Sequence, residues 1–436
     1  YGDHRDLHSF PTRRSSDLNH GLKGSITIPA DKSISHRAVM FSSLAKGKSI
    51  IRNFLYASDC RSTVSVFKNL GVDIEFIDNN TLSVKSSSVL KQPLTALDCG
   101  NSGTTMRLVS GILARQNFDS ELIGDASLSK RPMKRIIIPL MEMGAEILSE
   151  TGTAPLFIKG KSLKPIEYHS PIASAQVKSS ILLAGLGTEG VTTVVEPYLS
   201  RNHTEIMLKY MGADIESHDN IVKIKKSELR ACDIDVAGDI SSAAFFIVAG
   251  LIVPNSDIII KNVGLNPTRT GIIDVVKRMQ GNIEILDERI VSGEVVGDLR
   301  VRYSSLKSCS ISGADIPRLI DELPVIALLA TQADGETRIT DAGDLRNKEA
   351  DRISAVVKEF RKIGIEIDEL EDGFVICGKQ NIQGGNDVEV YHDHRLAMTL
   401  YIAGLIAQQE MCVKEFQWVD ISLPEFLPLM DSLSVL

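Results

Sequence analysis

The chain has 436 residues, of which 43% are hydrophobic, and a formal net charge of −8 at pH 7. A chain of this length predicts two domains of about 200 residues each. The acidic balance argues against nucleic acid as a partner, because proteins of that class usually carry a broad basic face.

Residues 1–18 differ from the rest of the chain. They are rich in Arg, Ser, Asp and His, lack the apolar core of a signal peptide and share no periodicity with the residues that follow. We interpret them as a scar of expression or sequence assembly and leave them out of the fold prediction.

From residue 32 onward, a short polar cluster precedes an apolar stretch with helical spacing six times, which predicts an internal repeat of roughly 70 residues. The clusters begin at or near Lys32, Asn101, Ser174, Asp239, Asp321 and His394. The first turn of a helix has unpaired N–H groups and about +0.5 charge, so it is a natural anion site. Six helix starts of one kind predict one shared site.

A second sequence pattern, called the closing phrase from here on, recurs after five predicted helices. The copies run from Asn69 to Ile74, Glu142 to Ile147, Tyr210 to Ile215, Arg278 to Ile283 and Lys362 to Ile367. Glycine supplies the left-handed position that ends a helix, and the alternating residues behind it begin a strand. The fourth copy has Gln280 in the glycine position, with Gly281 one residue later. Each repeat is therefore predicted to read helix, stop, strand.

Basic residues gather at the predicted helix starts. Five of them lie in or beside the polar clusters, namely Lys32, Arg37, Arg131, Arg352 and Arg395. A local group of cations in an acidic chain predicts a small, highly anionic ligand.

The first cluster allows two interpretations. Ser33 and Arg37 are four residues apart on one helix face, so both could hold a phosphate. The alternative is a capping serine followed by a solvated arginine, and this motif alone leaves both open. Ser35 and His36 are adjacent, so their side chains point apart, which argues against a nucleophile and base pair.

Two glycine-bearing stretches have different meanings. The stretch from Gly100 to Arg107 turns into a helix and lets a ligand approach backbone N–H groups, although alone it indicates only a helix cap. Gly185 to Gly190 matches G-x-G-x-x-G, but a helical pattern precedes it and the strand-like Val191 to Val195 follows it. That order is the reverse of a dinucleotide site, so we expect no nicotinamide or flavin cofactor.

The cysteines and the apolar runs also limit the classes of protein to which the chain can belong. The six cysteines include no C-x-x-C pair, which argues against a zinc ribbon or a disulfide framework and favours a reducing cytoplasm. The longest apolar run, from Ala243 to Val253, is too short for a bilayer, which needs about 20 residues. We expect a buried helix there and no membrane partner.

Charged strings recur toward the C-terminus. Lys348 and Arg352 are four apart at a predicted helix start with Glu349 between them, and two such cations repel unless an anion lies between them. By itself this string favours a solvated charge run. His392 to His394 could suggest a metal, but a metal site needs three or four converging ligands. A His-Arg pair at a helix start, facing an anion, explains this string better.

Seven strings together carry a family resemblance. They are DKSISHRA, GNSGTTMR, KRPM, SAQVK, IDELP, NKEADR and HDHRLAM, in the family's order between about Gly24 and the C-terminus. On these strings the chain closely resembles the 5-enolpyruvylshikimate-3-phosphate (EPSP) synthases. SAQVK and the stretches from Arg201 to Glu205 and from Asn266 to Arg269 resemble the second of that family's two main classes.

The resemblance implies the enolpyruvyl transferase fold, an α/β fold of two domains that forms an inverse α/β barrel from six βαβαββ repeats. Residues 31–237 would form the N-terminal domain with three repeats. Residues 19–30 and 238–436 would form the second domain with the other three, and the active site would lie in the interdomain cleft.

The implied reaction transfers the enolpyruvyl group of phosphoenolpyruvate to the 5-hydroxyl of shikimate 3-phosphate and releases phosphate, a step of aromatic amino-acid biosynthesis. The two substrates would be the partners of a cytoplasmic monomer, with no metal and no cofactor.

Each site residue takes its role from the matching motif. Shikimate 3-phosphate would be held by Ser33, Arg37, Ser174, Gln176, Ser200, Asp321 and Lys348. Phosphoenolpyruvate would be held by Lys32, Gly103, Arg131, Gln176, Arg352 and Arg395. The catalytic residues would be Asp321 as the base at the attacking hydroxyl, Glu349 as the acid at the methylene carbon, and Lys32 as a cation that also shuttles a proton.

Two alternatives stay open at this stage. The sister enolpyruvyl transferase that acts on UDP-N-acetylglucosamine would have asparagine after the opening lysine, where this chain has Ser33. An inactive anion-binding relative would not need Asp321 and Glu349, which are both present. Ile421 keeps the inactive relative open, because many relatives have a lysine in that loop.

Overall fold

The computed structural model describes residues 9–11 and 21–434 of the chain. These residues divide into two compact units. The N-terminal unit comprises Ala30–Ala237 and Ile290–Glu294; the C-terminal unit comprises the residues before Ala30, Gly238–Arg289 and the residues from Val295 onward.

Three sheets of the N-terminal unit repeat one pattern. Their strand orders are β14-β3-β5-β4, β6-β7-β9-β8 and β10-β11-β13-β12. In each sheet the first two strands pair parallel and the other pairs are antiparallel. The strands are β3 (Lys46–Arg52), β4 (Asp73–Asp78), β5 (Thr81–Ser87), β6 (Leu97–Asp98), β7 (Asp119–Ile123), β8 (Glu146–Leu148), β9 (Leu156–Lys159), β10 (Glu167–His169), β11 (Val191–Val195), β12 (Ile215–His218), β13 (Ile221–Lys225) and β14 (Ile234–Asp235).

The C-terminal unit has sheets of order β16-β17-β15-β2, β18-β20-β22-β21 and β1-β24-β23, with β19 also pairing with β20. Each again contains a parallel pair, namely β2 with β15, β18 with β20, and β23 with β24, and β19 also pairs with β20 in parallel. The strands are β1 (Ser9–Pro11), β2 (Lys23–Thr27), β15 (Asp257–Gly264), β16 (Asn282–Val291), β17 (Glu294–Arg302), β18 (Leu306–Lys307), β19 (Ser310–Ile311), β20 (Ala333–Ile339), β21 (Asp368–Leu370), β22 (Gly373–Gly378), β23 (Asp387–Val388) and β24 (Cys412–Lys414).

Strand β1 belongs to the segment that the sequence analysis left out of the fold. It pairs antiparallel with β24, with Phe10 opposite Val413. The other residues of the segment 1–18, which was interpreted as a scar, lie outside the described part of the chain.

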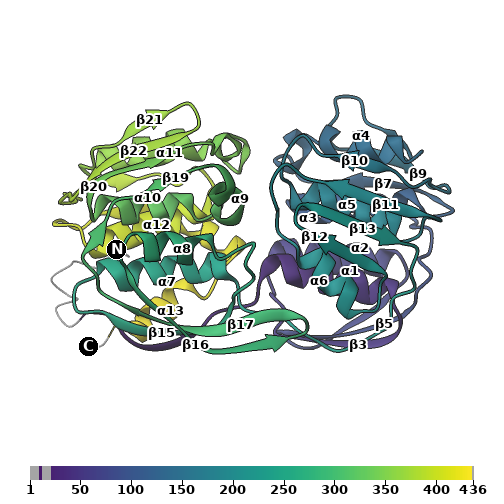
Figure 1. Cartoon of the computed structure of the whole chain (residues 1–436), viewed down its shortest axis with the longest axis horizontal. Helices are drawn as coiled ribbons and strands as arrows, with labels where there is room; N and C mark the ends of the chain where they lie inside the picture. Colours follow the sequence, from purple (N-terminus) through teal and green to yellow (C-terminus); the bar gives the residue numbers. More distant parts are fainter. Residues whose placement is uncertain (1–8, 12–20, 435–436) are drawn as a thin grey trace, which may run out of the picture. The chain divides into compact units, whose positions relative to one another are not determined.

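Six helices in the described ranges are buried along nearly their whole length, and each begins at a predicted polar cluster. They are α1 (Lys32–Leu44), α3 (Gly103–Ala114), α5 (Ala175–Gly185), α7 (Ile240–Ile252), α10 (Leu323–Thr331) and α12 (His394–Leu405). Within each unit these helices run through the centre and the sheets lie around them (Figure 1). The predicted six-fold α/β repeat is confirmed, and α7 is the buried helix expected from the apolar run.

The predicted order of helix, stop and strand was incomplete, because a second helix stands between the buried helix and the closing phrase. The closing phrases follow α2, α4, α6, α8 and α11. Their glycines take the left-handed conformation, as at Gly71 with φ +84°, and Gln280 takes φ +62° in the fourth copy. The helices outside the buried set are α2 (Ser58–Asn69), α4 (Lys134–Glu142), α6 (His203–Tyr210), α8 (Gly271–Arg278), α9 (Ile316–Leu319), α11 (Arg352–Lys362) and α13 (Phe426–Leu433).

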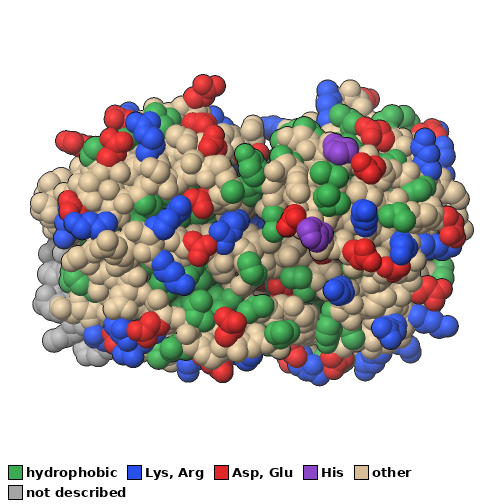
Figure 2. Space-filling model, in the orientation of Figure 1, with side chains coloured by type: hydrophobic (Ala, Val, Ile, Leu, Met, Phe, Trp, Pro, Cys, Tyr) green, Lys and Arg blue, Asp and Glu red, His purple; other side chains and the backbone are tan. Residues whose placement is uncertain are grey.

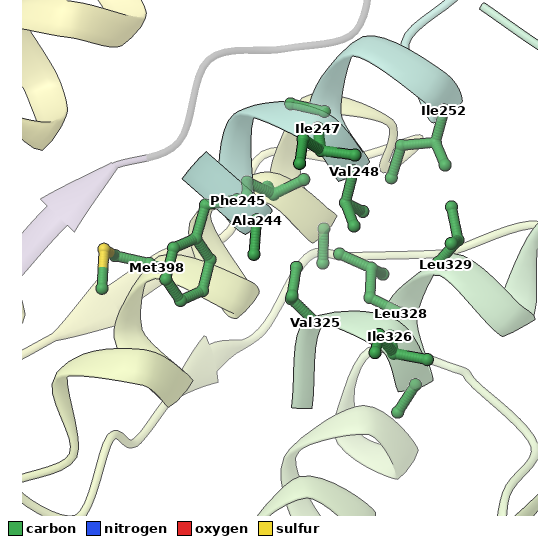
Figure 3. Packing of buried hydrophobic residues seen from close by; sticks show 14 of the residues in the cluster. Ala244, Phe245, Ile247, Val248, Ile252, Val325, Ile326, Leu328, Leu329 and Met398 are labelled. Carbon is green, nitrogen blue, oxygen red and sulfur yellow. The ribbon is translucent and has the colours of Figure 1, made fainter. Parts of the chain in front are cut away.

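Apolar side chains of the three buried helices form the core of the C-terminal unit. Phe245 and Val248 of α7 and Leu328 of α10 are fully or almost fully buried, as is Met398 of α12 (Figure 3). Fully burying one such side chain contributes about 1.5–3 kcal/mol, so this cluster holds the starts of the three helices in fixed positions.

The surface in Figure 2 shows basic and acidic side chains interspersed, with no broad basic area on that face. Within residues 21–434 and the strand β1, no helix is long and apolar enough to cross a membrane. The first finding agrees with the exclusion of nucleic acid from composition.

A glycine sets the closest approach of α3 and α5. A Cβ atom at Gly111 would lie 2.1 Å from the Ser180 carbonyl oxygen, a backbone atom that cannot move aside. We predict that Gly111→Ala lowers the free energy of unfolding by at least about 3 kcal/mol in urea denaturation. Gly343→Ala is the control, because its Cβ would meet nothing closer than Asp372 Cβ at 3.8 Å. Equal effects of the two variants would contradict the prediction.

Candidate active site

Lys32 opens α1 of the N-terminal unit. The Asp31 carboxylate caps this helix and accepts a hydrogen bond of 2.8 Å from the Ile34 amide. The Lys32 ammonium lies 3.2 Å from the Asp59 carboxylate of α2, and both side chains are partly exposed. Sequence analysis missed Asp59, because an acidic residue in the first turn of a helix is common for reasons of the helix dipole alone.

A group of polar side chains surrounds the start of α3. A Cβ atom at Gly103 would lie 3.0 Å from Arg107 Nη1 and 3.6 Å from Arg131 Nη1, so both guanidinium groups face this glycine. Arg131 Nη2 donates to Asn101 Oδ1 at 2.7 Å. The lack of a side chain at Gly103 lets two cations approach this helix start, which is an arrangement suited to an anion.

Gln176 joins this group from α5. Its amide nitrogen donates to Thr104 Oγ1 at 3.0 Å, and its amide oxygen accepts from Arg107 Nη1. The structure therefore brings together three predicted site residues, Gly103, Arg131 and Gln176. Arg107 was missed as a site residue, although its place one helical turn after Gly103 is a usable signal.

Arg37 is buried, which excludes the alternative of a solvated arginine. Its guanidinium donates to Thr204 Oγ1 at 2.7 Å, to Ser179 Oγ at 3.1 Å and to the Ser33 carbonyl oxygen at 2.9 Å. Burial lowers the pKa of Arg37 to about 10, against the opposing effect of nearby Glu205. These bonds direct the guanidinium toward α5 and α6, and a direct contact with phosphate stays a prediction.

Two predicted serines lie beside a buried glutamate that sequence analysis missed. Ser174 stands just before α5, and its amide donates to Glu196 Oε1 at 3.1 Å. The Ser200 hydroxyl donates to Glu196 Oε2 at 2.9 Å. Ser33 is half-buried on the first turn of α1. The three serines thus belong to the loops and first turns around buried helices.

In the C-terminal unit, the buried Arg352 lies among three carboxylates. Its Nε lies 2.6 Å from Asp393 Oδ2, its Nη2 lies 2.6 Å from Glu349 Oε2, and its Nη1 lies 3.4 Å from Asp321 Oδ1. Burial opposes the charge of Arg352, but Asp393, Glu349 and Asp321 outweigh it and raise the pKa of Arg352. The cation and the predicted base and acid are therefore in contact.

Two more predicted cations lie beside carboxylates of the same unit. Lys348 Nζ lies 3.4 Å from Asp321 Oδ1 and 3.6 Å from Asp344 Oδ2. Arg395 Nη1 lies 4.0 Å from the buried Glu322 carboxylate, which also accepts from the Ser241 hydroxyl. Asp321, Lys348, Glu349 and Arg352 thus form one cluster, and the charged string at 348–352 is not a solvated run.

The string at 392–394 is used in a different way from a metal site. Asp393 caps α12 by accepting from the Arg395 amide at 2.9 Å and also binds Arg352. Among the residues that the structure describes, no group of three His, Cys, Asp or Glu is placed to hold a metal ion. The G-x-G-x-x-G stretch lies between the end of α5 at Gly185 and the start of β11 at Val191, as predicted.

A buried polar chain lies beneath the helix starts of the N-terminal unit. His36 Nδ1 lies 2.6 Å from Thr63 Oγ1, which lies 2.7 Å from Thr105 Oγ1, and the Thr105 hydroxyl donates to Ser102 Oγ at 2.7 Å. Desolvation by burial lowers the pKa of His36 from 6.5 to about 3, against the opposing effect of Asp59. His36 is therefore neutral and links α1, α2 and α3.

Comparison with known proteins gives one consistent result. The family model described as EPSP synthase (3-phosphoshikimate 1-carboxyvinyltransferase) matches residues 17–430. A protein of Bacillus velezensis with the name 3-phosphoshikimate 1-carboxyvinyltransferase is 49% identical over 417 residues, covering 95% of this chain and 97% of that protein. One of Bacillus thuringiensis with the same name is 51% identical over 421 residues, covering 96% and 98%.

Solved structures agree. An EPSP synthase of Acinetobacter baumannii has a TM-score of 0.88 and 40% sequence identity, covering 98% of each chain. The enolpyruvyl transferase NikO of Streptomyces tendae has a TM-score of 0.78 at 17% identity, covering 98% of this chain and 97% of NikO, which is a likeness of fold.

The buried imidazole of His36 makes the stability of the chain depend on pH. Between pH 6.5 and about 3 the unfolded chain binds a proton that the folded chain does not, so stability falls as the pH falls. Between pH 7 and pH 5, we predict that the free energy of unfolding falls by about 2 kcal/mol less in His36→Gln than in the unsubstituted chain, as measured by urea denaturation. His218→Gln, at a site whose side chain is 91% exposed, serves as the control and should keep the slope of the unsubstituted chain. The same slope in His36→Gln would contradict a neutral buried imidazole.

Proposed function

The chain belongs to the EPSP synthase family, and on that premise we propose how its side chains serve the reaction. The chain transfers the enolpyruvyl group of phosphoenolpyruvate to the 5-hydroxyl of shikimate 3-phosphate and releases phosphate. The observation that carries the proposal is the set of buried helices whose starts bring cations and carboxylates together in both units. We also propose two domains of three repeats each, one formed by residues 31–237 and the other by residues 19–30 together with 238–436.

The substrates are assigned as the family motifs suggest. The residues that bind phosphoenolpyruvate are Lys32, Gly103, Arg131, Gln176, Arg352 and Arg395. The residues that bind shikimate 3-phosphate are Ser33, Arg37, Ser174, Gln176, Ser200, Asp321 and Lys348. Each substrate carries a carboxylate and a phosphate, and a hydrogen bond to a charged group contributes about 1.5–3 kcal/mol. The two arginines that face Gly103 support an anion at that helix start, and Arg107 is added to the phosphoenolpyruvate residues on this ground.

The addition step needs a base and an acid. Asp321 takes the proton of the 5-hydroxyl, the oxygen bonds to C2 of phosphoenolpyruvate, and Glu349 gives a proton to the methylene carbon. The product of this step is a tetrahedral intermediate. In the elimination, the Glu349 carboxylate takes a proton back from the new methyl group, the double bond re-forms and the C2–O bond to phosphate breaks. Lys32, paired with Asp59, neutralises charge on the leaving phosphate and shuttles a proton.

Contacts within the C-terminal unit support this division of roles. Lys348 and Arg352, each 3.4 Å from Asp321, favour its ionised form, as a base requires. Glu349 is paired with Arg352. A substrate anion bound at Arg352 adds negative charge beside Glu349 and favours its protonated form, as an acid requires.

The alternatives gain no support. Ser33 stands where the UDP-N-acetylglucosamine enzyme would have asparagine, and both carboxylates that an inactive relative could lose are in contact with Arg352. We also propose, from the family resemblance, a cytoplasmic monomer that uses neither metal nor cofactor.

The reaction is tested by phosphate release from phosphoenolpyruvate. We predict release with shikimate 3-phosphate and no release with UDP-N-acetylglucosamine or without an acceptor. Release with UDP-N-acetylglucosamine alone would indicate the sister reaction. Absence of release with every acceptor, from protein with a cooperative unfolding transition, would contradict the proposed function.

The base is tested by Asp321→Asn. We predict a fall in kcat of about 100-fold or more, since loss of general-base catalysis typically costs that much. Asp344→Asn is the matched control, because Asp344 also pairs with Lys348 while its side chain is 57% exposed. Near-normal turnover of a well-folded Asp321→Asn would exclude Asp321 as the base.

A further inference from the structure

Glu196 is a buried carboxylate that bonds to two of the predicted shikimate 3-phosphate residues. It lies in the loop after β11 and is 2% exposed. Its Oε1 accepts from the Ser174 amide at 3.1 Å. Its Oε2 accepts from the Ser200 hydroxyl at 2.9 Å and from the Ser200 amide at 3.3 Å. One carboxylate thus ties together the start of α5 and the loop that carries Ser200.

A buried lysine compensates the charge of this carboxylate. Lys178 Nζ lies 2.8 Å from Glu196 Oε2 and 2.8 Å from Glu205 Oε1, and the lysine side chain is fully buried. Lys178 Nζ also donates to the Ser200 carbonyl oxygen at 3.4 Å. Burial disfavours the ammonium, but Glu205 and Glu196 outweigh it and raise the pKa of Lys178. The ammonium therefore stays charged beside Glu196.

Hydrophobic residues would fill this space at lower cost in desolvation, since a buried ion pair often contributes little net stability. What the ion pair does supply is fixed geometry. Ser174 and Ser200 come from separate segments, and both are held by atoms of Glu196. A site for a phosphate needs its hydroxyl donors in place before the ligand arrives.

The Ser200 hydroxyl can donate its single proton either to the Glu196 carboxylate or to a phosphate. The hydroxyl has one proton, which it donates to Glu196. When the hydroxyl turns to a phosphate, Glu196 still accepts from the Ser174 and Ser200 amides and still pairs with Lys178. The carboxylate can therefore release the hydroxyl without becoming a buried unpaired charge.

We propose that Glu196, neutralised by Lys178, is a positioning residue that presets Ser174 and Ser200 for the 3-phosphate of the acceptor substrate. This inference rests on the proposed function. It predicts that loss of the carboxylate weakens recognition of the phosphate group specifically, and leaves recognition of the rest of the acceptor and of phosphoenolpyruvate nearly unchanged.

The experiment compares two acceptors that differ only in the phosphate, shikimate 3-phosphate and shikimate. The measured quantity is the ratio of kcat/KM for the first to kcat/KM for the second. We expect Glu196→Gln to lower this ratio about tenfold or more, because hydrogen bonds to charged groups are weakened, while KM for phosphoenolpyruvate changes little. Where turnover of shikimate is too slow, the ratio of the two Kd values from calorimetry serves in its place.

The matched control is Glu359→Gln in the C-terminal unit. Glu359 is a fully buried glutamate that accepts from the Tyr391 hydroxyl and the Glu389 amide and pairs with Lys362. Its loss should lower stability and leave the ratio unchanged. If Glu196→Gln lowers kcat/KM for both acceptors by the same factor, Glu196 is merely structural and the proposal is wrong.

A second variant covers a failure to fold. Glu196→Asp keeps the charge that Lys178 needs but is too short to reach both serines, so it should fold and still lower the ratio. An unchanged ratio in this variant would also overturn the proposal. The two levels of inference remain separable, because an inactive unsubstituted chain contradicts the proposed function, whereas an active one with an unaffected ratio in the variants contradicts only the role of Glu196.

Discussion

The N–H groups in the first turn of a buried helix need acceptors, and this constraint shapes both units. Water cannot supply the acceptors in the interior, and leaving such a group unpaired costs about 1–3 kcal/mol. Asp31, Ser102, Asp239 and Asp393 cap four of the buried helices with their side chains. At two of these starts the capping carboxylate also pairs with an arginine, Asp239 with Arg269 and Asp393 with Arg352. Polar clusters of both charges at buried helix starts are thus a consequence of burying the helices.

The same constraint explains how charged arginine side chains can be buried in the protein interior. Arg352 is 2% exposed, yet three carboxylates compensate its charge. Arg37 is satisfied by hydroxyls and a carbonyl instead. A substrate that binds at Arg352 therefore competes with groups of the chain itself, and binding and the protonation state of those groups are coupled.

Much of the fold could be predicted because it repeats. The six polar clusters predicted the starts of the six buried helices. The glycine patterns predicted the turns from helix to strand. One of these turns has Gln280 with a φ of +62°, a conformation that glycine normally takes. The polar clusters and glycine patterns alone did not separate the second helix of each repeat from the first, and only the family resemblance, with its βαβαββ unit, implied it. Among the site residues, the sequence did not predict Arg107, Asp59 and Glu196. Their roles come from contacts with residues distant in the sequence, such as that of Arg107 with Gln176, and no local pattern encodes such contacts.

The N-terminal unit is inserted within the other, and this has a consequence for synthesis. Strand β2 pairs with β15, whose residues leave the ribosome only after the whole of Ala30–Ala237. The inserted unit brings its own ends together, since the Asp31 amide donates to the Ala237 carbonyl at 2.7 Å. Its folding thereby closes a loop of about 200 residues whose entropy would otherwise oppose the β2–β15 pairing. His203 receives its partner Glu294 later still, so the inserted unit is completed by a segment that is translated after β15.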